Sequence, residues 1–135
     1  MGSRDVTARK TAHPAGGARR GLGTLGEDLA GRHLAAAGYD LLARNWRCPT
    51  GELDLIARQA DTLVLVEVRT RRGDALGSPE ESLTPAKQAR LIALAEAYVQ
   101  ATGWPGAWRI DVVAVEMDRS GRLLRVDHYE NAVTG

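Results

Sequence analysis

The segment LVLVEVRTRR, Leu63–Arg72, constrains the fold of this chain most strongly. Five of its first six residues are aliphatic, which is typical of a strand buried on both faces of a sheet. The same run carries Glu67 and Arg69. A carboxylate in a dry strand costs free energy unless it is paired, hydrogen-bonded or bound to a cation. The fold must therefore bury this strand and also give Glu67 a partner.

The other elements follow from apolar spacing and turn residues. Residues 24–38 have the spacing of a helix, and Thr84, Pro85 and Gly103 are typical of the N-cap, first residue and end of a second helix. A glycine-rich, polar stretch over residues 72–83 predicts an exposed loop. Further strands are expected at residues 39–46, 52–58, 109–115 and 122–130. The predicted order is αβββαβ with one extra strand at the C-terminal end.

Composition predicts one domain and a basic tail. Residues 1–21 lack apolar periodicity and favour a disordered tail, whose first 20 residues carry a net charge of +4, while residues 22–132 form the expected domain. The lone Cys48 excludes an internal disulfide and indicates a reducing compartment. No apolar run approaches the roughly 20 residues that span a bilayer. We therefore expect a soluble, cytoplasmic protein without a membrane partner.

Strand register brings two carboxylates together. With a four-residue loop at 59–62, Ile56 pairs with Leu65 and Asp54 stands opposite Glu67, with Cβ atoms about 5 Å apart. Like charges at this spacing destabilise a sheet, so the register predicts a cation between them. Mg²⁺ or Mn²⁺ is the natural candidate, because a hard cation takes one or two carboxylates and completes its shell with water and phosphate. A slip by one residue would separate the two acids.

Ion pairs are the alternative to a metal. Glu67 has Arg69 on its own face, and Asp54 could pair with Arg109 on another strand. Taken together, two acids inside aliphatic strands favour the metal interpretation. The histidines show no ligand spacing, and we assign no chemistry to them: His13, His33 and His128.

Two motifs carry a resemblance to a known family. GELDLIA at residues 51–57, followed by LVLVEVRTR at residues 63–71, resembles the YraN-like family of predicted endonucleases. That family belongs to the Holliday-junction-resolvase-like branch of the PD-(D/E)XK nuclease superfamily. The resemblance covers residues 22–132. It implies an α/β, restriction-endonuclease-like αβββαβ core, in which two helices flank a mixed central sheet.

The resemblance also implies roles for particular residues. Asp54 and Glu67 match the metal-binding acids, and Val68 matches the residue whose backbone carbonyl often completes the metal site. Glu27 matches an acid on the first helix, although Thr24-x-x-Glu27 is equally a capping box. The family has lysine where this chain has Arg69, which stays protonated and cannot act as a base.

The implied activity is Mg²⁺- or Mn²⁺-dependent hydrolysis of DNA, with branched recombination or repair intermediates as substrates and a homodimer as the assembly. Residues near the acids and on the second helix are the candidates for phosphate contacts: Arg71, Arg72, Lys87 and Arg90. Because Arg69 departs from the family pattern, whether the chain is an enzyme stays open. The alternatives are a nucleic-acid-binding module that is catalytically weak or inactive, and a scaffold whose acids are all salt-bridged.

Overall fold

The computed structural model describes residues 22–73 and 83–133, with side chains from residue 24 onward. The predicted tail at residues 1–21 and most of the predicted loop, residues 74–82, lie outside this part. The described residues form two helices and five strands: α2 (Leu22–Ala36), β1 (Asp40–Cys48), β2 (Gly51–Gln59), β3 (Thr62–Arg72), α3 (Pro85–Thr102), β4 (Trp108–Met117) and β5 (Leu123–Val133). This order confirms the predicted αβββαβ arrangement with an extra strand.

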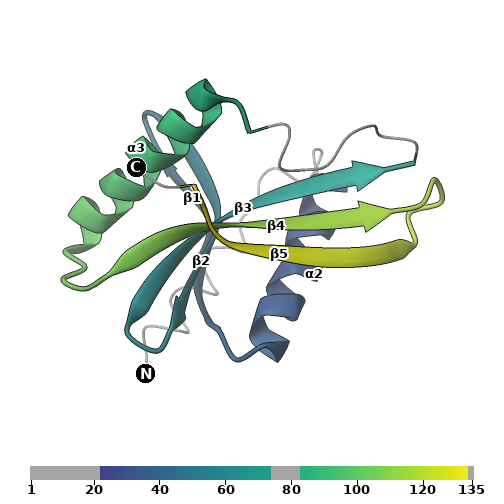
Figure 1. Ribbon diagram of the computed structural model, residues 1–135, viewed down its shortest axis with the longest axis horizontal. Coiled ribbons are helices and arrows are strands. Elements are labelled where there is room, and N and C mark those ends of the chain that lie inside the picture. The colour runs from purple at the N-terminus through teal and green to yellow at the C-terminus, as the bar shows by residue number, and fades with distance from the viewer. Residues whose placement is uncertain (1–21, 74–82, 134–135) are drawn as a thin grey trace.

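The strands form one mixed sheet in the order β1-β2-β3-β4-β5. β3 and β4 are parallel and are joined through α3, whereas the other neighbours are antiparallel. The two helices lie on opposite faces of this twisted sheet (Figure 1). None of the helices in the described ranges is long and apolar enough to cross a bilayer.

Strand β3 is covered on both faces, as its aliphatic run predicts. Leu63 and Leu65 belong to the core cluster that includes Leu91 and Leu94 of α3. Val64 and Val66 belong to the second cluster, which includes Ala30 and Leu34 of α2. Because successive side chains of a strand point to opposite faces, an uninterrupted apolar run fits a strand between two helices.

Both predicted ends of α3 are present. The Thr84 hydroxyl accepts a hydrogen bond from the amide of Lys87 at 3.2 Å, as an N-cap does. At the other end Gly103 has a φ of 70° and donates its amide to the carbonyl of Val99. A glycine adopts this left-handed conformation without steric cost and ends the helix.

The β2–β3 hairpin has the predicted register. Ile56 pairs with Leu65, and the hairpin closes with Gln59 opposite Thr62. The connecting turn therefore contains two residues, Ala60 and Asp61, and the expected four-residue loop is wrong in length although the strands are in the expected register. The pairing in this register extends to Leu55 with Val66, the positions next to Asp54 and Glu67.

Candidate metal centre

The sheet opens where the two predicted metal ligands lie. The last residue pair between β2 and β3 is Leu55 with Val66, so the next positions along the strands are Asp54 and Glu67. Here the carboxylate of Asp54 replaces the backbone ladder, because its Oδ2 accepts a hydrogen bond from the amide of Val68 at 2.8 Å. The structure therefore brings Asp54, Glu67 and Val68 together.

A distortion of β1 lies beside this opening. Asn45 stands between the pairs Arg44–Leu55 and Trp46–Leu53, across from Asp54, and has a φ of 55°. Asparagine tolerates this left-handed conformation better than most residues. The side-chain nitrogen Nδ2 of Asn45 donates to Glu27 Oε1 at 3.1 Å and to Glu52 Oε2 at 2.8 Å. Asn45 therefore links an acid of α2 to an acid of β2.

Glu27 faces the sheet. Helix α2 already includes Leu22, so Thr24 lies inside the helix and cannot be its N-cap. Besides Asn45, Arg44 of β1 holds the carboxylate, with Nη2 at 3.3 Å from Oε1. The capping-box alternative for Glu27 is therefore wrong.

Close packing holds this part of α2 against the sheet. A Cβ atom on Gly26 would overlap the hydroxyl of Thr70 on β3. Only glycine lets the helix backbone approach the strand this closely. The next residue along the helix is Glu27, which contacts Arg44 and Asn45 of β1.

The electrostatics of Asp54 depend on this gathering of acids. Loss of water around the carboxylate is the largest cause, and repulsion from Glu67 the next, of a rise in the pKa of Asp54 to about 8. The Val68 amide opposes the rise, while Glu27 and Glu52 add to it. Ionisation of Asp54 is thus opposed by its surroundings, and a bound cation, like a proton, would offset the charge of this carboxylate.

Glu67 forms an ion pair with Arg69. Its Nη1 lies 3.0 Å from Oε2 of Glu67, and both side chains are about one-fifth exposed. The ion pair considered as an alternative for Glu67 is therefore present. The pair suggested for Asp54 is not, because Arg109 binds Asp111 at 2.9 Å instead.

The donor set fits a hard, partly hydrated cation. Within residues 22–73 and 83–133, no three acidic, histidine or cysteine side chains converge closely enough to hold an ion by themselves. Mg²⁺ and Mn²⁺ do not require such a cage, since one or two carboxylates with water and substrate phosphate complete their shell. Asp54 and Glu67 supply this number of carboxylates, and Val68 is the adjacent backbone group.

The predicted phosphate contacts lie on two elements. Arg71 and Arg72 follow Glu67 on β3, and Arg72 donates through Nε to the carbonyl of Arg119 at 3.1 Å. Lys87 is exposed on α3. Arg90 of the same helix lies over the start of β2, where its Nη2 would be 3.0 Å from a Cβ atom on Gly51.

Two residues of this site were missed by sequence reasoning. Asn45 and Glu52 join Glu27 to the opening in the sheet. One signal existed, because asparagine is depleted in strands and enriched at positive φ. An asparagine inside the predicted first strand therefore indicates a local distortion.

The comparison with known proteins agrees with the motifs. The profile described as "Uncharacterised protein family UPF0102" matches residues 26–115. The chain belongs to the UPF0102 family. A UPF0102 protein of Roseiflexus castenholzii is 49% identical over 119 residues, covering 87% of this chain and 96% of that protein. UPF0102 proteins of Pelotomaculum thermopropionicum and Streptomyces coelicolor are 47% and 49% identical, covering 85% and 77% of this chain and 97% and 82% of those proteins. The UPF0102 match covers most of α2, all of β1, β2, β3 and α3, and most of β4.

Proposed function

We propose that this UPF0102 protein is a divalent-metal-dependent DNA endonuclease that hydrolyses phosphodiester bonds. The observation that carries the proposal is the position of Asp54 and Glu67 directly beyond the last β2–β3 residue pair, with the Asp54 carboxylate held by the amide of Val68. The raised pKa of Asp54 beside Glu67 supports it. Strongly perturbed acids of this kind cluster at functional sites. The YraN-like motifs on β2 and β3 support the same function.

Each residue has a distinct task in the proposed reaction. Asp54 and Glu67 would hold the ion, with the Val68 carbonyl as a further ligand, and Glu27 would support these acids from α2 through its contact with Asn45. When bound, Mg²⁺ or Mn²⁺ neutralises charge on the scissile phosphate and lowers the pKa of the attacking water. With Glu67 engaged by an ion, the guanidinium of Arg69 would donate hydrogen bonds to the water or to the phosphate oxygens, since it cannot accept a proton.

The substrate is DNA, bound chiefly through its phosphates. Arg71 and Arg72 extend from the strand that carries Glu67, while Lys87 and Arg90 add positive charge from α3. Affinity carried by such contacts falls with rising salt concentration and is independent of sequence. Branched intermediates are the preferred substrates, and a homodimer supplies the two sites that a symmetric junction needs. The proposed compartment is the cytoplasm.

One observation favours a second candidate function. The guanidinium of Arg69 is 3.0 Å from the carboxylate of Glu67 and competes with an incoming ion. If Arg69 keeps this partner, the protein is a nucleic-acid-binding module that retains a nuclease fold without cleavage.

Cleavage of labelled branched, nicked and single-stranded DNA in Mg²⁺ or Mn²⁺ separates the two functions. Wild type should cut at least one substrate, Asp54→Asn and Glu67→Gln should not, and Asp61→Asn in the exposed hairpin turn should cut like wild type. Cleavage by Arg69→Lys alone would mean an intact but detuned site. Binding of DNA without cleavage by either protein would favour the binding module.

A further inference from the structure

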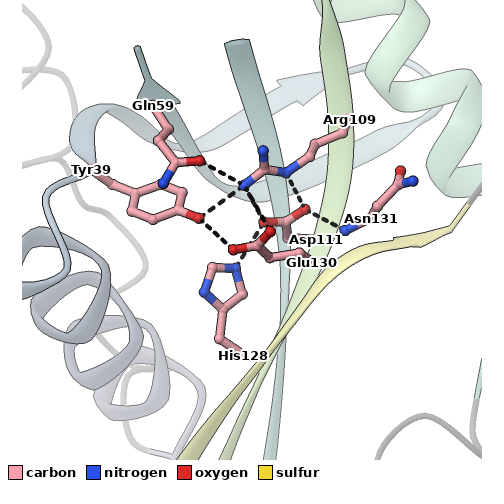
Figure 2. A network of polar contacts seen from close by, with 7 residues as sticks. All are labelled: Tyr39, Gln59, Arg109, Asp111, His128, Glu130 and Asn131. Carbon is pink, nitrogen blue, oxygen red and sulfur yellow. Dashed lines mark hydrogen bonds and ion pairs between the residues drawn. The ribbon is translucent and has the colours of Figure 1, made fainter.

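A second polar network lies on the α2 side of the sheet, next to the last turn of that helix. Asp111 is wholly buried on β4 and accepts hydrogen bonds from the side chains of Arg109 and His128 and from the amide of Asn131 (Figure 2). The residues of this network do not include Asp54, Glu67, Val68 or Glu27 of the candidate metal centre.

The fold brings two histidines together at this network. The rings of His33, in the last turn of α2, and His128, on β5, have centroids 6.5 Å apart and planes at 83°. His33 is exposed, and the side chain of His128 is 13% exposed. The two residues are 95 positions apart in the sequence, so no local motif indicates that they lie together.

Asp111 fixes the chemistry of His128. Its Oδ2 lies 2.8 Å from Nε2 of the ring. The same carboxylate accepts hydrogen bonds from the side chain of Arg109 and from the amide of Asn131, so it acts as an acceptor in these contacts. When Nε2 of His128 likewise donates to Asp111, the other ring nitrogen, Nδ1, carries a lone pair.

The lone pair on Nδ1 is available for a ligand. The second ring nitrogen of His128 points away from Asp111 (Figure 2). Within the described ranges, the hydrogen bond recorded for this ring is the one to Asp111. A histidine that donates one ring N–H to a buried carboxylate and offers the other nitrogen outward is the usual arrangement of a metal ligand.

We propose that His33 and His128 form a second cation site for a borderline transition metal such as Zn²⁺, Ni²⁺ or Cu²⁺. Imidazole nitrogens suit these ions and not Mg²⁺. With metal–nitrogen bonds of about 2.0–2.1 Å, two imidazoles on one tetrahedral ion have ring centres roughly 5–6 Å apart. The observed separation is slightly larger, and the exposed side chain of His33 closes it by turning about its side-chain bonds.

The site is open and joins two elements. No third histidine, cysteine or acid within the described ranges converges on the pair, so water or an incoming ligand fills the remaining positions. A bound ion links the end of α2 to β5, the strand at the edge of the sheet. The inference is independent of the proposed nuclease function, because it uses neither Asp54 nor Glu67.

Isothermal titration of the full-length protein with Ni²⁺ tests the site. Wild type should bind one ion at the histidine pair, and His33→Ala should weaken that binding at least tenfold. His33 is the decisive variant because its exposed side chain can be removed without disturbing the buried network. His13→Ala and Asp54→Asn should bind like wild type, which separates this site from the tail and from the acids.

Nuclear magnetic resonance gives a second readout. Substoichiometric Cu²⁺ should broaden the ring signals of His33 and His128 before those of His13, and His128→Gln, if its circular dichroism is unchanged, should abolish the broadening at His33. Equal Ni²⁺ affinity of wild type and His33→Ala would overturn the proposal, as would the absence of any binding to wild type. Either result would leave the histidines as a packing contact at the end of α2.

Discussion

Replacing Asp54 by asparagine should stabilise the metal-free protein at neutral and alkaline pH. Asparagine has the same shape, and its carbonyl can still accept the hydrogen bond that the Val68 amide donates at 2.8 Å. What the substitution removes is a carboxylate whose ionisation is opposed by desolvation and by Glu67. Removing this predicted metal-binding carboxylate should therefore make the metal-free folded protein more stable. This result is expected where a binding site contains charge that nothing offsets.

The rise in pKa sets the size of the effect. A change from 3.8 to about 8, at about 1.4 kcal/mol per unit, corresponds to an upper limit of about 6 kcal/mol. The neighbouring carboxylates share the proton that relieves the repulsion, so we expect a gain of about 1–3 kcal/mol in the free energy of unfolding. This gain corresponds to a rise of several degrees in Tm.

The raised pKa of Asp54 determines whether stability rises or falls with pH. The folded state holds a proton on Asp54 to a higher pH than the unfolded state does, so wild type loses stability as pH rises between about 4 and 8. Asp54→Asn lacks this loss. Urea unfolding in EDTA should show the two proteins equal near pH 4 and the variant more stable at pH 8. A variant that is less stable than wild type at pH 8, or a difference independent of pH, would refute the reasoning.

Three further substitutions test neighbouring parts of the account. Arg69→Lys should raise the affinity for Mn²⁺, measured by calorimetry, because a single ammonium holds its carboxylate partner less firmly than the guanidinium fork does; unchanged affinity would mean that the ion pair does not compete with the metal. Gly26→Ala should destabilise by about 1–3 kcal/mol through overlap with β3, whereas Gly31→Ala on the same helix, which meets only the end of a leucine side chain at 3.3 Å, should be nearly neutral; equal unfolding midpoints would contradict this contrast. Asp111→Asn should cost about 3–5 kcal/mol at pH 7, and because the pKa of Asp111 is lowered in the folded protein, the loss should shrink as pH falls below about 4 and disappear only below the lowered pKa; a loss independent of pH would exclude the ionised carboxylate as its cause.

Local chemistry explains what the sequence could predict. The aliphatic run of β3 requires cover on both faces, and α2 and α3 provide it. The ends of α3 depend on Thr84 and Gly103, whose effects reach only one turn of helix. The register of the β2–β3 hairpin, with Ile56 opposite Leu65, could be predicted because a slip by one residue would turn every side chain of the strand to the other face.

Contacts between distant segments could not be predicted in this way. The close approach of α2 to β3 depends on the missing Cβ atom at Gly26. The sequence around a helical glycine does not indicate which distant residue packs against it. Whether Arg109 pairs with Asp54 or with Asp111 depends on how the strands are arranged. In the structure Arg109 pairs with Asp111, two residues along its own strand. The meeting of His33 with His128 requires the whole sheet to be assembled.

Calorimetric titration of Mn²⁺ into the metal-free, full-length protein is the most direct test of the central claim that Asp54 and Glu67 hold a divalent ion. His33→Ala serves as the background, so that the histidine pair contributes nothing to the heat. The account predicts saturable binding of Mn²⁺ in this background and its loss in both Asp54→Asn and Glu67→Gln, with Asp61→Asn unaffected. Binding that survives both substitutions, or no binding with or without DNA, would contradict the account.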